Sequence, residues 1–340
     1  MSGKISRTFF ENNIINRIGK IRNEVVIPPK NGVDVGIIKL ADSYMAVTTD
    51  PLYIDISFGL RRAAWFAMHI LLSDLYTAGI EAQYMSIDLN LPESLSDNDF
   101  NIIWGVINEE CVKFNIEIVT GHTARYAGTG FPMVGGVTLM GVGKKYITTE
   151  NAKPGDKIIM VRSCGLEASI ILANTFPEYV KERLGSDAHK RIDSMFYDMS
   201  CVNIEKLAIE YGIGSKITSM HDATEGGLLN SIYEIGTASG NGIIIDFDKI
   251  IIDPDIKSIC NLFEINPLRS ISEGTLLLTV KKEYTDGFIA LIESNGLKCS
   301  VIGDVLDRSS GIKIDENGKT VDILPEDDQI WAALKHGVGR

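Results

Sequence analysis

The chain of 340 residues has few cysteines, few prolines and no long apolar run. Its five cysteines are an odd number without a CxxC pair, which argues against a disulfide framework or a zinc site and favours a reducing compartment. No segment reaches the roughly 18 apolar residues of a membrane span, and the N-terminal segment lacks the apolar core of a signal peptide. We therefore expect a cytoplasmic protein without a membrane partner.

Positive charge is also scarce, because 33 Lys and Arg residues stand against 45 Asp and Glu residues and leave a formal net charge of −12. Such a surface repels phosphate backbones, so we expect no nucleic-acid partner. A small anion bound through magnesium remains compatible with an acidic protein, since the metal supplies the positive charge. With 45% hydrophobic and 23% charged residues the composition is globular, and the length predicts about two domains.

Segments typical of strands and of helices alternate along the first half of the chain. A helix is predicted over 59–79 from the spacing of its apolar residues, and Ser96 is a candidate N-cap for a second helix that runs to Phe114. Short β-rich runs predict strands at 32–40 and 44–50 and buried strands at 116–123 and 133–143. This half therefore reads as mixed helix and strand.

The turn signal Pro154-Gly155 separates this half from a second one with the same alternation, so we predict domains at 1–150 and 151–340. Strands are predicted at 157–163, 216–222, 242–247, 274–280 and 299–305. Helices are predicted from 165 to about 211 and at 226–240, 256–263, 285–295 and 328–336, with a hairpin around 315–318. No repeat of 20–50 residues is present, which argues against a solenoid or a propeller.

Four aspartates stand at strand ends or on the apolar side of a helix, namely Asp34, Asp50, Asp74 and Asp222. Magnesium prefers hard oxygen ligands and keeps water and phosphate in its shell, so dispersed carboxylates suit it. Asp74 is the most informative, because helical spacing places it on the packed face, where an unpartnered charge is costly. The alternative for each aspartate is an ordinary turn or helix-end residue that points to water.

The segment that follows Asp222 has the pattern of an anion-binding helix start. A strand is predicted to end at Asp222, Thr224 is a candidate cap of the next helix, and Gly226 and Gly227 leave its first amides open to phosphate. Glu225 would repel phosphate unless a cation lies between them. The alternative is an ordinary helix start whose glycines serve close packing. Neither a Walker A loop nor a GxGxxG turn is present.

Further polar residues stand in or next to predicted elements. Gly121 and His122 follow a strand in TGHTARY, and His122 is a candidate ligand, phosphate donor or general acid/base, or else a structural turn residue. His69 lies on an apolar helix and is predicted to be a hydrogen-bonded core residue. Glu273 precedes a strand and either reaches a cleft or lies exposed at an edge. Cys164 has no paired histidine, which argues against a nucleophile.

The ordered set of motifs resembles the PurM/AIR-synthase superfamily, and the resemblance covers nearly the whole chain. The motifs are GVDVGII, AVTTDP, SDLYTAGIEAQY, IVTGHT, KPGDKIIM, HDATEGGL, SEGTLLLTV and VIGDV. The superfamily includes aminoimidazole ribonucleotide synthase, the hydrogenase-maturation protein HypE, selenophosphate synthetase and thiamine-monophosphate kinase. Within it, the chain is most similar to the archaeal AIR-synthase-related, HypE-like proteins, whose GHT and MHDxTEGGL segments it shares.

The resemblance implies a mixed α/β fold, with an N-terminal domain that pairs in a homodimer to build a shared β-barrel and a C-terminal α/β domain. It places ATP between the domains, near the dimer interface. The residues implied to bind the nucleotide are Asp34, Thr49, Asp50, Asp74, Gly121, His122, Thr224, Gly226 and Gly227. Those implied to hold Mg²⁺ are Asp34, Asp50, Asp74 and Asp222. Catalytic roles fall on Asp50, His122 and Asp222, and His122 stands where several members carry aspartate.

The chain also departs from the family pattern. HypE itself ends in a cysteine that accepts a carbamoyl group, whereas the last cysteine here is Cys299 and the sequence ends in KHGVGR. We therefore do not expect that reaction on the chain's own tail. The N-terminal Cys or Sec motif of selenophosphate synthetase is absent as well.

The function implied by the resemblance is ATP- and magnesium-dependent phosphoryl transfer to an oxygen of a small acceptor, or of a carbamoyl or amide group borne by a partner protein. The alternative is a non-catalytic nucleotide-binding scaffold or sensor, which His122 and the missing C-terminal cysteine favour. Arg61, Arg62 and Arg125, if they face the cleft, would instead favour an enzyme that binds an acceptor.

Overall fold

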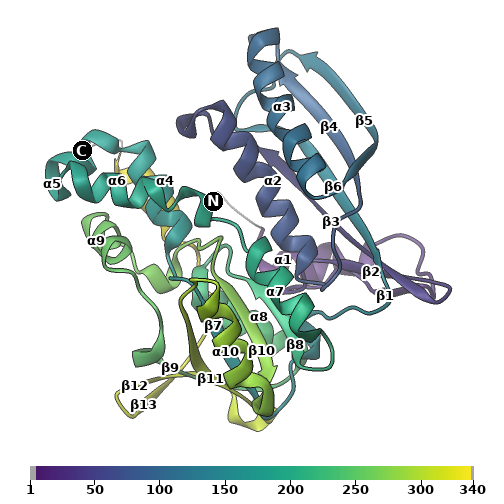
Figure 1. The fold of residues 1–340 in the computed structure, drawn as a ribbon, viewed down its shortest axis with the longest axis vertical. Helices are drawn as coiled ribbons and strands as arrows, with labels where there is room; N and C mark the ends of the chain where they lie inside the picture. Colours follow the sequence, from purple (N-terminus) through teal and green to yellow (C-terminus); the bar gives the residue numbers. More distant parts are fainter. Residues whose placement is uncertain (1–4, 338–340) are drawn as a thin grey trace.

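Two β-sheets, one in each half of the chain, organise the computed structural model, which describes residues 5–337 (Figure 1). The first has six strands in the order β1-β2-β3-β6-β4-β5, and β4 and β5 are its one parallel pair. Its strands are β1 (Val25–Ile27), β2 (Gly36–Leu40), β3 (Ser43–Tyr53), β4 (Tyr84–Pro92), β5 (Glu117–Tyr126) and β6 (Met133–Gly143).

Helices α2 (Leu60–Tyr76) and α3 (Asp97–Lys113) pack side by side against this sheet (Figure 1). Their apolar side chains form one core with the inward-facing residues of β2, β3, β4 and β6. The prediction of a buried strand at 116–123 is wrong, because β5 lies at the edge of the sheet and most of its side chains are exposed. The sheet is open in the single chain, with β1 and β5 at its edges.

The second sheet has seven strands in the order β13-β12-β9-β11-β7-β10-β8. They are β7 (Asp156–Val161), β8 (Ile217–Asp222), β9 (Gly242–Asp246), β10 (Leu276–Lys281), β11 (Cys299–Leu306), β12 (Ile312–Glu316) and β13 (Lys319–Asp322). Side chains alternate between the faces, as in any strand. Ile158 and Met160 therefore pack with α8 (Gly227–Ser239), while Ile159 and Val161 pack with α7 (Val202–Gly212) and α10 (Thr285–Ser294).

The remaining helices of the second half form a group beyond the sheet (Figure 1). They are α4 (Leu166–Thr175), α5 (Pro177–Leu184), α6 (Ser186–Ser194), α9 (Pro254–Leu262) and α11 (Ile330–Gly337). Their apolar residues continue the core of α2 and α3 without a break, and Phe196 packs edge-on against Phe58 and Phe66 at 5.2 and 6.2 Å between ring centroids. The two halves therefore share one apolar core.

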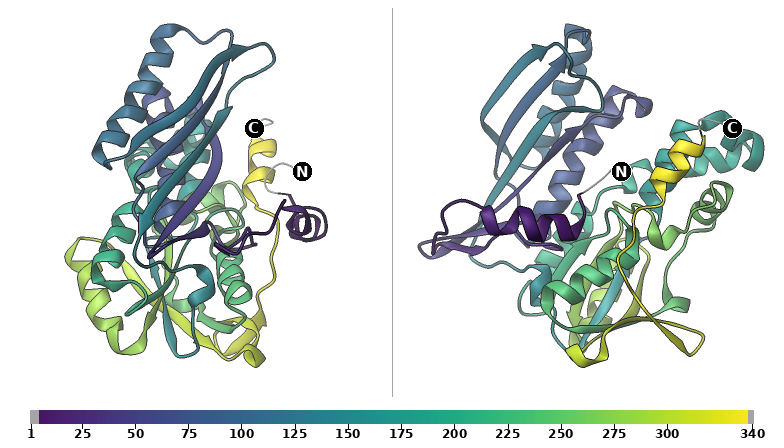
Figure 2. Two further views of the ribbon diagram at one scale, coloured as in Figure 1. Left: turned by 90° about the vertical axis from the view of Figure 1, so that its right-hand side faces the viewer. Right: turned by 180° about the vertical axis from the view of Figure 1, so that it is seen from behind.

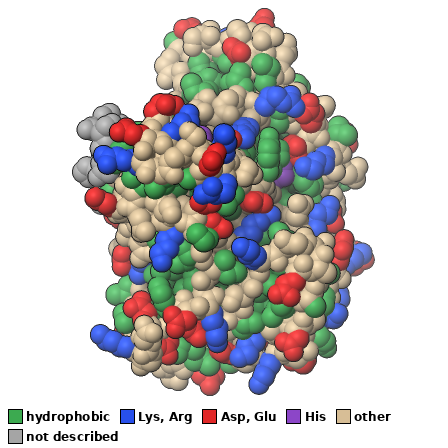
Figure 3. Space-filling view, turned by 60° about the vertical axis from the view of Figure 1, so that its left-hand side comes forward, with side chains coloured by type: hydrophobic (Ala, Val, Ile, Leu, Met, Phe, Trp, Pro, Cys, Tyr) green, Lys and Arg blue, Asp and Glu red, His purple; other side chains and the backbone are tan. Residues whose placement is uncertain are grey.

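The N-terminal helix α1 (Arg7–Asn13) crosses to the second half (Figure 2). Arg7 lies over the ring of Tyr233 and donates to Thr237, both on α8. Among the described residues, no helix is long and apolar enough to cross a membrane. Basic and acidic side chains are interspersed on the face shown in Figure 3, so no field of one sign dominates that face.

The mixed α/β fold of two domains is confirmed, and so are the helices predicted at 59–79 and 96–114 and the hairpin around 315–318. The helical character predicted from 165 to about 211 is confirmed, and the structure divides it into the separate helices α4, α5, α6 and α7. Strands β1 and β4 were not predicted. The boundary between 150 and 151 falls between the two sheets and stays a prediction, as does the shared barrel.

Candidate active site

Three of the four aspartates singled out from the sequence lie close together where the two halves of the chain meet. Asp222 ends β8, Asp34 precedes β2 and Asp74 lies on α2. A ring nitrogen of His221 and carboxylate oxygens of Asp34 and Asp222 lie within 4.8 Å of one another. Thr48 Oγ1 donates to the main-chain oxygen of Asp34 at 3.1 Å and lies 3.4 Å from Asp74 Oδ2. Both halves therefore contribute carboxylates to one site.

Buried acids of the C-terminal half adjoin this group. Asp222 and Glu205 have no exposed surface and Glu273 is 1% exposed, and no hydrogen bond of ordinary geometry reaches their side-chain oxygens among the described residues. Burial, and then the charge of Asp34, raises the pKa of Asp222 to about 6. Burial and the charge of Asp222 raise the pKa of both glutamates well above their usual range. Acids therefore outnumber bases at this site.

The donor set suits a hard divalent cation. Carboxylate oxygens from Asp34, Asp74 and Asp222 are the ligand type that magnesium prefers, and the unpartnered oxygens of Asp222 are available to it. A buried carboxylate without a partner is costly, and a bound cation removes that cost. We therefore expect magnesium to bind through the aspartates, with solvent or a phosphate completing its shell.

His221 orients this site and is not itself suited to be a ligand. Its Nδ1 lies 2.9 Å from Asp34 Oδ2 and its Nε2 lies 2.9 Å from Glu234 Oε2. Burial lowers the pKa of His221, but the carboxylates of Asp34 and Glu234 outweigh it and hold the pKa well above the usual value. Both nitrogens then carry protons and donate, so neither has a lone pair for a metal. Sequence reasoning missed this residue, although it directly precedes Asp222.

A further acid lies behind Glu273. Glu167, on α4, is buried and accepts a hydrogen bond from the main-chain nitrogen of Glu273 at 3.0 Å. Burial raises its pKa to about 8. Neither Glu167 nor Glu205 was identified from the sequence. Each stands among apolar residues in a helical segment, and this position was the only feature of the sequence that could have indicated a buried acid.

The start of α8 departs from the predicted phosphate cradle in two ways. Its N-cap is Gly226, so the prediction that Thr224 caps the helix is wrong. The amide of Gly226 donates to Asp328 Oδ2 at 2.6 Å, and that of Gly227 donates to the main-chain oxygen of Thr224 at 2.9 Å. A carboxylate therefore occupies the position where we predicted phosphate, while Glu225 is half-buried beside it.

Gly227 has a packing role as well. Its φ is +63°, and a Cβ at this position would lie 2.6 Å from the main-chain oxygen of Ser270. The close-packing alternative considered for these glycines therefore applies to Gly227. A nucleotide role for Gly226 and Gly227 stays a prediction.

The remaining candidates of the first half lie on the sheet. Asp50 is on the same face of β3 as Thr48, two residues away, and is half-buried. Thr49 points to the opposite face and accepts a hydrogen bond from Thr138 at 3.0 Å. Gly121 and His122 are on the edge strand β5, three strands away from β3.

His122 is on the face of the sheet opposite to Asp50. Asp50 pairs with Val137 on β6, which pairs in turn with Ile87 on β4, whereas His122 pairs with Asp88, one residue further along β4. Successive residues of a strand point to opposite faces, so the two side chains diverge. His122 is exposed and contacts the hydroxyl of Tyr126 at 2.8 Å. Within one chain, the structure does not bring His122 to the aspartates.

Three arginines considered as acceptor-binding groups are engaged elsewhere. Arg61 pairs with Glu109 at 2.6 Å, Arg62 pairs through two bonds with Asp193, and Arg125 binds Asp97 and the main-chain oxygen of Leu95. They therefore do not support an acceptor site. Cys164 is buried with a pKa raised above its usual range by burial, which agrees with the absence of a nucleophilic role.

Comparison with known proteins identifies the family. The model of the AIR synthase related protein N-terminal domain matches residues 32–143, and that of the C-terminal domain matches residues 153–315. A putative hydrogenase expression/formation protein of Methanocaldococcus jannaschii is 29% identical over 72% of this chain and 70% of its own length. Carbamoyl dehydratase HypE of Rhizobium leguminosarum is 24% identical over 81% of this chain and 77% of its own length.

Solved structures agree on the fold. A hydrogenase maturation protein HypE in complex with ATP has a TM-score of 0.64 at 17% identity and covers 95% of this chain and 93% of its own. The HypE–HypF complex has a TM-score of 0.68 at 21% identity, over 85% and 93% of the two chains. The two matched domain models, the relatives and the shared fold agree, and the chain belongs to the AIR synthase related protein family.

Proposed function

We propose that this chain is an ATP- and magnesium-dependent enzyme that transfers phosphate to an oxygen atom of a small acceptor, or of a carbamoyl or amide group borne by a partner protein. The observation that carries the proposal is the group of buried acids from both halves of the chain, in which Asp222 has no hydrogen-bond partner of ordinary geometry. Such an arrangement is costly in a protein that never binds a cation.

The names of related proteins support nucleotide chemistry. They include carbamoyl dehydratase HypE, selenide, water dikinase and thiamine-monophosphate kinase, and the structural neighbours include a HypE with ATP and a ThiL with AMPPCP and TMP. A HypE–HypF complex supports a protein partner as the source of the acceptor.

In this proposal, Asp34, Asp74 and Asp222 hold magnesium, and Asp50 adds a carboxylate from the same face of β3 as Thr48. The bound metal neutralises charge on the phosphates of ATP. His221 keeps Asp34 oriented through the 2.9 Å contact at Nδ1. The protein's own part is therefore to position the phosphates and to present them with a fixed, water-poor set of charges.

A homodimer is part of the proposal, because His122 faces away from Asp50 within one chain. The edge strand β5 carries exposed apolar side chains, with Val119 50% exposed and Tyr126 42% exposed. An open edge with apolar residues favours pairing with another strand. A second copy of this chain paired at β5 is the arrangement that allows the predicted nucleotide role of His122.

The dimer is tested by light scattering of the wild type and of Val119→Lys. We expect the wild type to have the mass of two chains and Val119→Lys to have the mass of one. Val112→Lys is the matched control, since Val112 is 73% exposed on α3, away from β5, and should leave the mass unchanged. A monomeric wild type would exclude the dimer.

The enzymatic proposal is tested by ATP turnover with magnesium, measured as ADP release in the presence of candidate acceptors. Asp222→Asn and Asp50→Asn should each lower turnover at least about a hundredfold, since each removes a charge from the metal site. Asp286→Asn is the control, because Asp286 is exposed on α10. Near-normal turnover in both site variants would refute the assignment of these aspartates.

The second candidate is a nucleotide-binding scaffold or sensor without turnover. The exposed His122, which stands where several family members carry aspartate, favours it. Thermal unfolding with ATP and magnesium separates the two, because a scaffold is stabilised by the nucleotide but releases no ADP. Absence of stabilisation at millimolar ATP would remove both candidates.

A further inference from the structure

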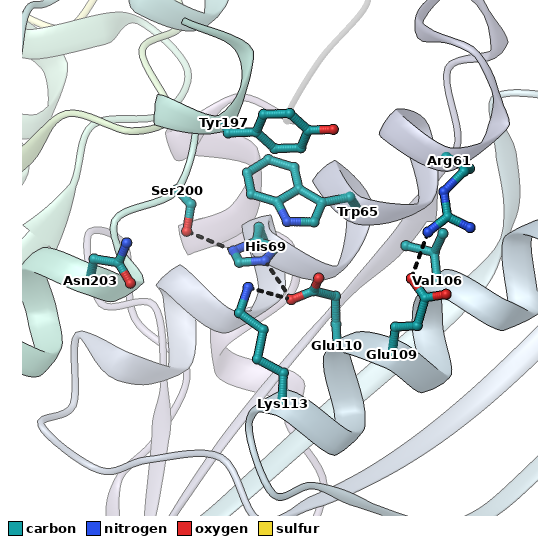
Figure 4. A pocket seen from close by; sticks show the side chains of 10 residues that line it. All are labelled: Arg61, Trp65, His69, Val106, Glu109, Glu110, Lys113, Tyr197, Ser200 and Asn203. Atoms are coloured by element: carbon teal, nitrogen blue, oxygen red, sulfur yellow. Dashed lines mark hydrogen bonds and ion pairs between the residues drawn. The ribbon is translucent and has the colours of Figure 1, made fainter.

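A second polar site lies between the two halves of the chain. A cavity of about 430 Å³ opens between α2, α3 and the segment before α7 (Figure 4). None of Asp34, Asp74 and Asp222 is among the residues that line it. The residues proposed to hold magnesium are therefore not part of this cavity.

Three side chains in the wall of the cavity form a continuous hydrogen-bonded chain (Figure 4). Ser200 Oγ lies 2.7 Å from His69 Nδ1, and His69 Nε2 lies 3.1 Å from Glu110 Oε2. The exposed fractions of Ser200, His69 and Glu110 are only 7%, 3% and 9%. A hydroxyl, an imidazole and a carboxylate in this order are the elements of a nucleophile, its base and the group that orients the base.

The environment sets the protonation of each member. Burial lowers the pKa of His69, so the imidazole is neutral. Burial opposes ionisation of Glu110, but hydrogen bonds from His69 and Lys113 outweigh it and lower the pKa of the carboxyl group. With Glu110 ionised, Nε2 carries the proton and donates to it, and the lone pair of Nδ1 accepts the Ser200 hydroxyl.

The surroundings hold this arrangement in place. The indole of Trp65 stacks on the His69 ring, with 4.0 Å between centroids, and fixes the plane of the imidazole. The amide of Val202, at the start of α7, donates to Ser200 Oγ over 3.4 Å. First-turn amides stabilise negative charge, and the side chain of Asn203 also lines the cavity. Hydrogen-bond donors therefore lie beside Ser200.

We propose that Ser200, His69 and Glu110 form a second catalytic site, which hydrolyses small uncharged esters. Ser200 Oγ attacks the acyl carbon as its proton passes to His69 Nδ1. The alkoxide then leaves with that proton and an acyl-serine remains. Water attacks the acyl-serine, gives its proton to His69, and releases the acid as the proton returns to Ser200. Glu110 stays ionised and keeps the imidazole in one tautomer throughout.

The charges in the cavity select the class of substrate. Lys113 pairs with Glu110 at 3.0 Å, and Arg61 pairs with Glu109 at 2.6 Å. Each cation is thus matched by a carboxylate, and no surplus positive charge is available to bind a phosphate. An uncharged ester enters such a cavity without leaving a buried charge unpaired.

The test is covalent labelling with a fluorophosphonate probe, with the modified residue identified by peptide mass spectrometry. We expect the wild type to be labelled at Ser200 and to hydrolyse p-nitrophenyl acetate. Ser200→Ala should lose both, whereas Ser194→Ala, which removes an exposed serine of α6, should keep both. Glu110→Gln, nearly equal in size, should slow labelling at least about tenfold, because it leaves the imidazole without its anionic partner.

Thermal unfolding of each variant shows whether it is folded. A folded wild-type protein that is not labelled at Ser200 overturns the proposal without reference to any variant, and so does labelling that Glu110→Gln leaves unchanged. Asp222→Asn should keep full labelling while it loses ATP turnover. Failure of the ester site and failure of the nucleotide site are therefore distinguished in the same set of variants.

Discussion

Replacement of Asp222 by asparagine should make the metal-free protein more stable, although it removes a residue of the proposed active site. Asp222 is fully buried, and its carboxylate has no hydrogen-bond partner of ordinary geometry among the described residues. An amide of nearly the same size fills the same space without a charge. It can also donate a hydrogen bond toward the neighbouring acids, which a carboxylate cannot.

The magnitude follows from the pKa of Asp222. Burial, and then the charge of Asp34, raises it from an ordinary 3.8 to about 6 in the folded protein. A raised carboxyl pKa contributes stability that is complete below pH 3.8 and is lost as the pH rises through 6. At about 1.36 kcal/mol per pH unit, the difference corresponds to roughly 3 kcal/mol at pH 7.5. Asp222→Asn should recover most of that amount.

The assay is urea unfolding in EDTA at pH 4 and at pH 7.5. At pH 4 the carboxyl group is largely protonated, so the variant and the wild type should have similar free energies of unfolding. At pH 7.5 the variant should be more stable, while Asp286→Asn should match the wild type at both pH values. Equal or lower stability of Asp222→Asn at pH 7.5 would refute the reasoning that burial and the charge of Asp34 cost Asp222 more than the charge of His221 returns.

Three further variants test other parts of the structure. Burial raises the pKa of Glu167 to about 8. The free energy of unfolding should therefore fall more steeply between pH 4.5 and 8 in the wild type than in Glu167→Gln, as measured by urea titrations at several pH values. Arg62→Leu removes a partly exposed, two-bond ion pair with Asp193 and should cost about 1 kcal/mol in urea unfolding, less in high salt. Gly227→Ala should cost at least about 2 kcal/mol by the same measurement, because its φ is +63° and the new Cβ would lie 2.6 Å from the Ser270 carbonyl oxygen.

Much of the architecture could be predicted from local patterns. The apolar spacing over 59–79 and the Ser96 cap gave α2 and α3, and Ser96 accepts the expected hydrogen bond from the Asp99 amide. Strand β4 escaped prediction because residues 84–92 end in Pro92 and their partners lie on β5 and β6, far along the chain. Local propensity carries no information about such partners.

The residues of the candidate site also divide into those that local sequence patterns reveal and those that they do not. Asp34, Asp74 and Asp222 were found because each stands at a strand end or on a helix face that the sequence reveals. Glu205 was missed, because its burial depends on packing between α7 and the rest of the molecule. Asp328 was missed as well, since it reaches the start of α8 from 102 residues away. Contacts of this kind become visible only when the chain is folded.

The buried acids link the two halves of the chain at the proposed nucleotide site. Asp34 and Asp74 come from the first half of the chain, whereas Asp222, Glu205 and Glu273 come from the second. When no cation is bound, the ionised aspartates repel one another across the boundary, and the protonated His221 offsets only part of that repulsion, which weakens the association of the halves. A bound cation reverses the sign of that interaction, because each carboxylate then attracts the same charge. We therefore expect magnesium with ATP to stabilise the contact between the halves as well as each half separately. Loss of a single aspartate on either side should then weaken the stabilisation of the whole chain by magnesium with ATP.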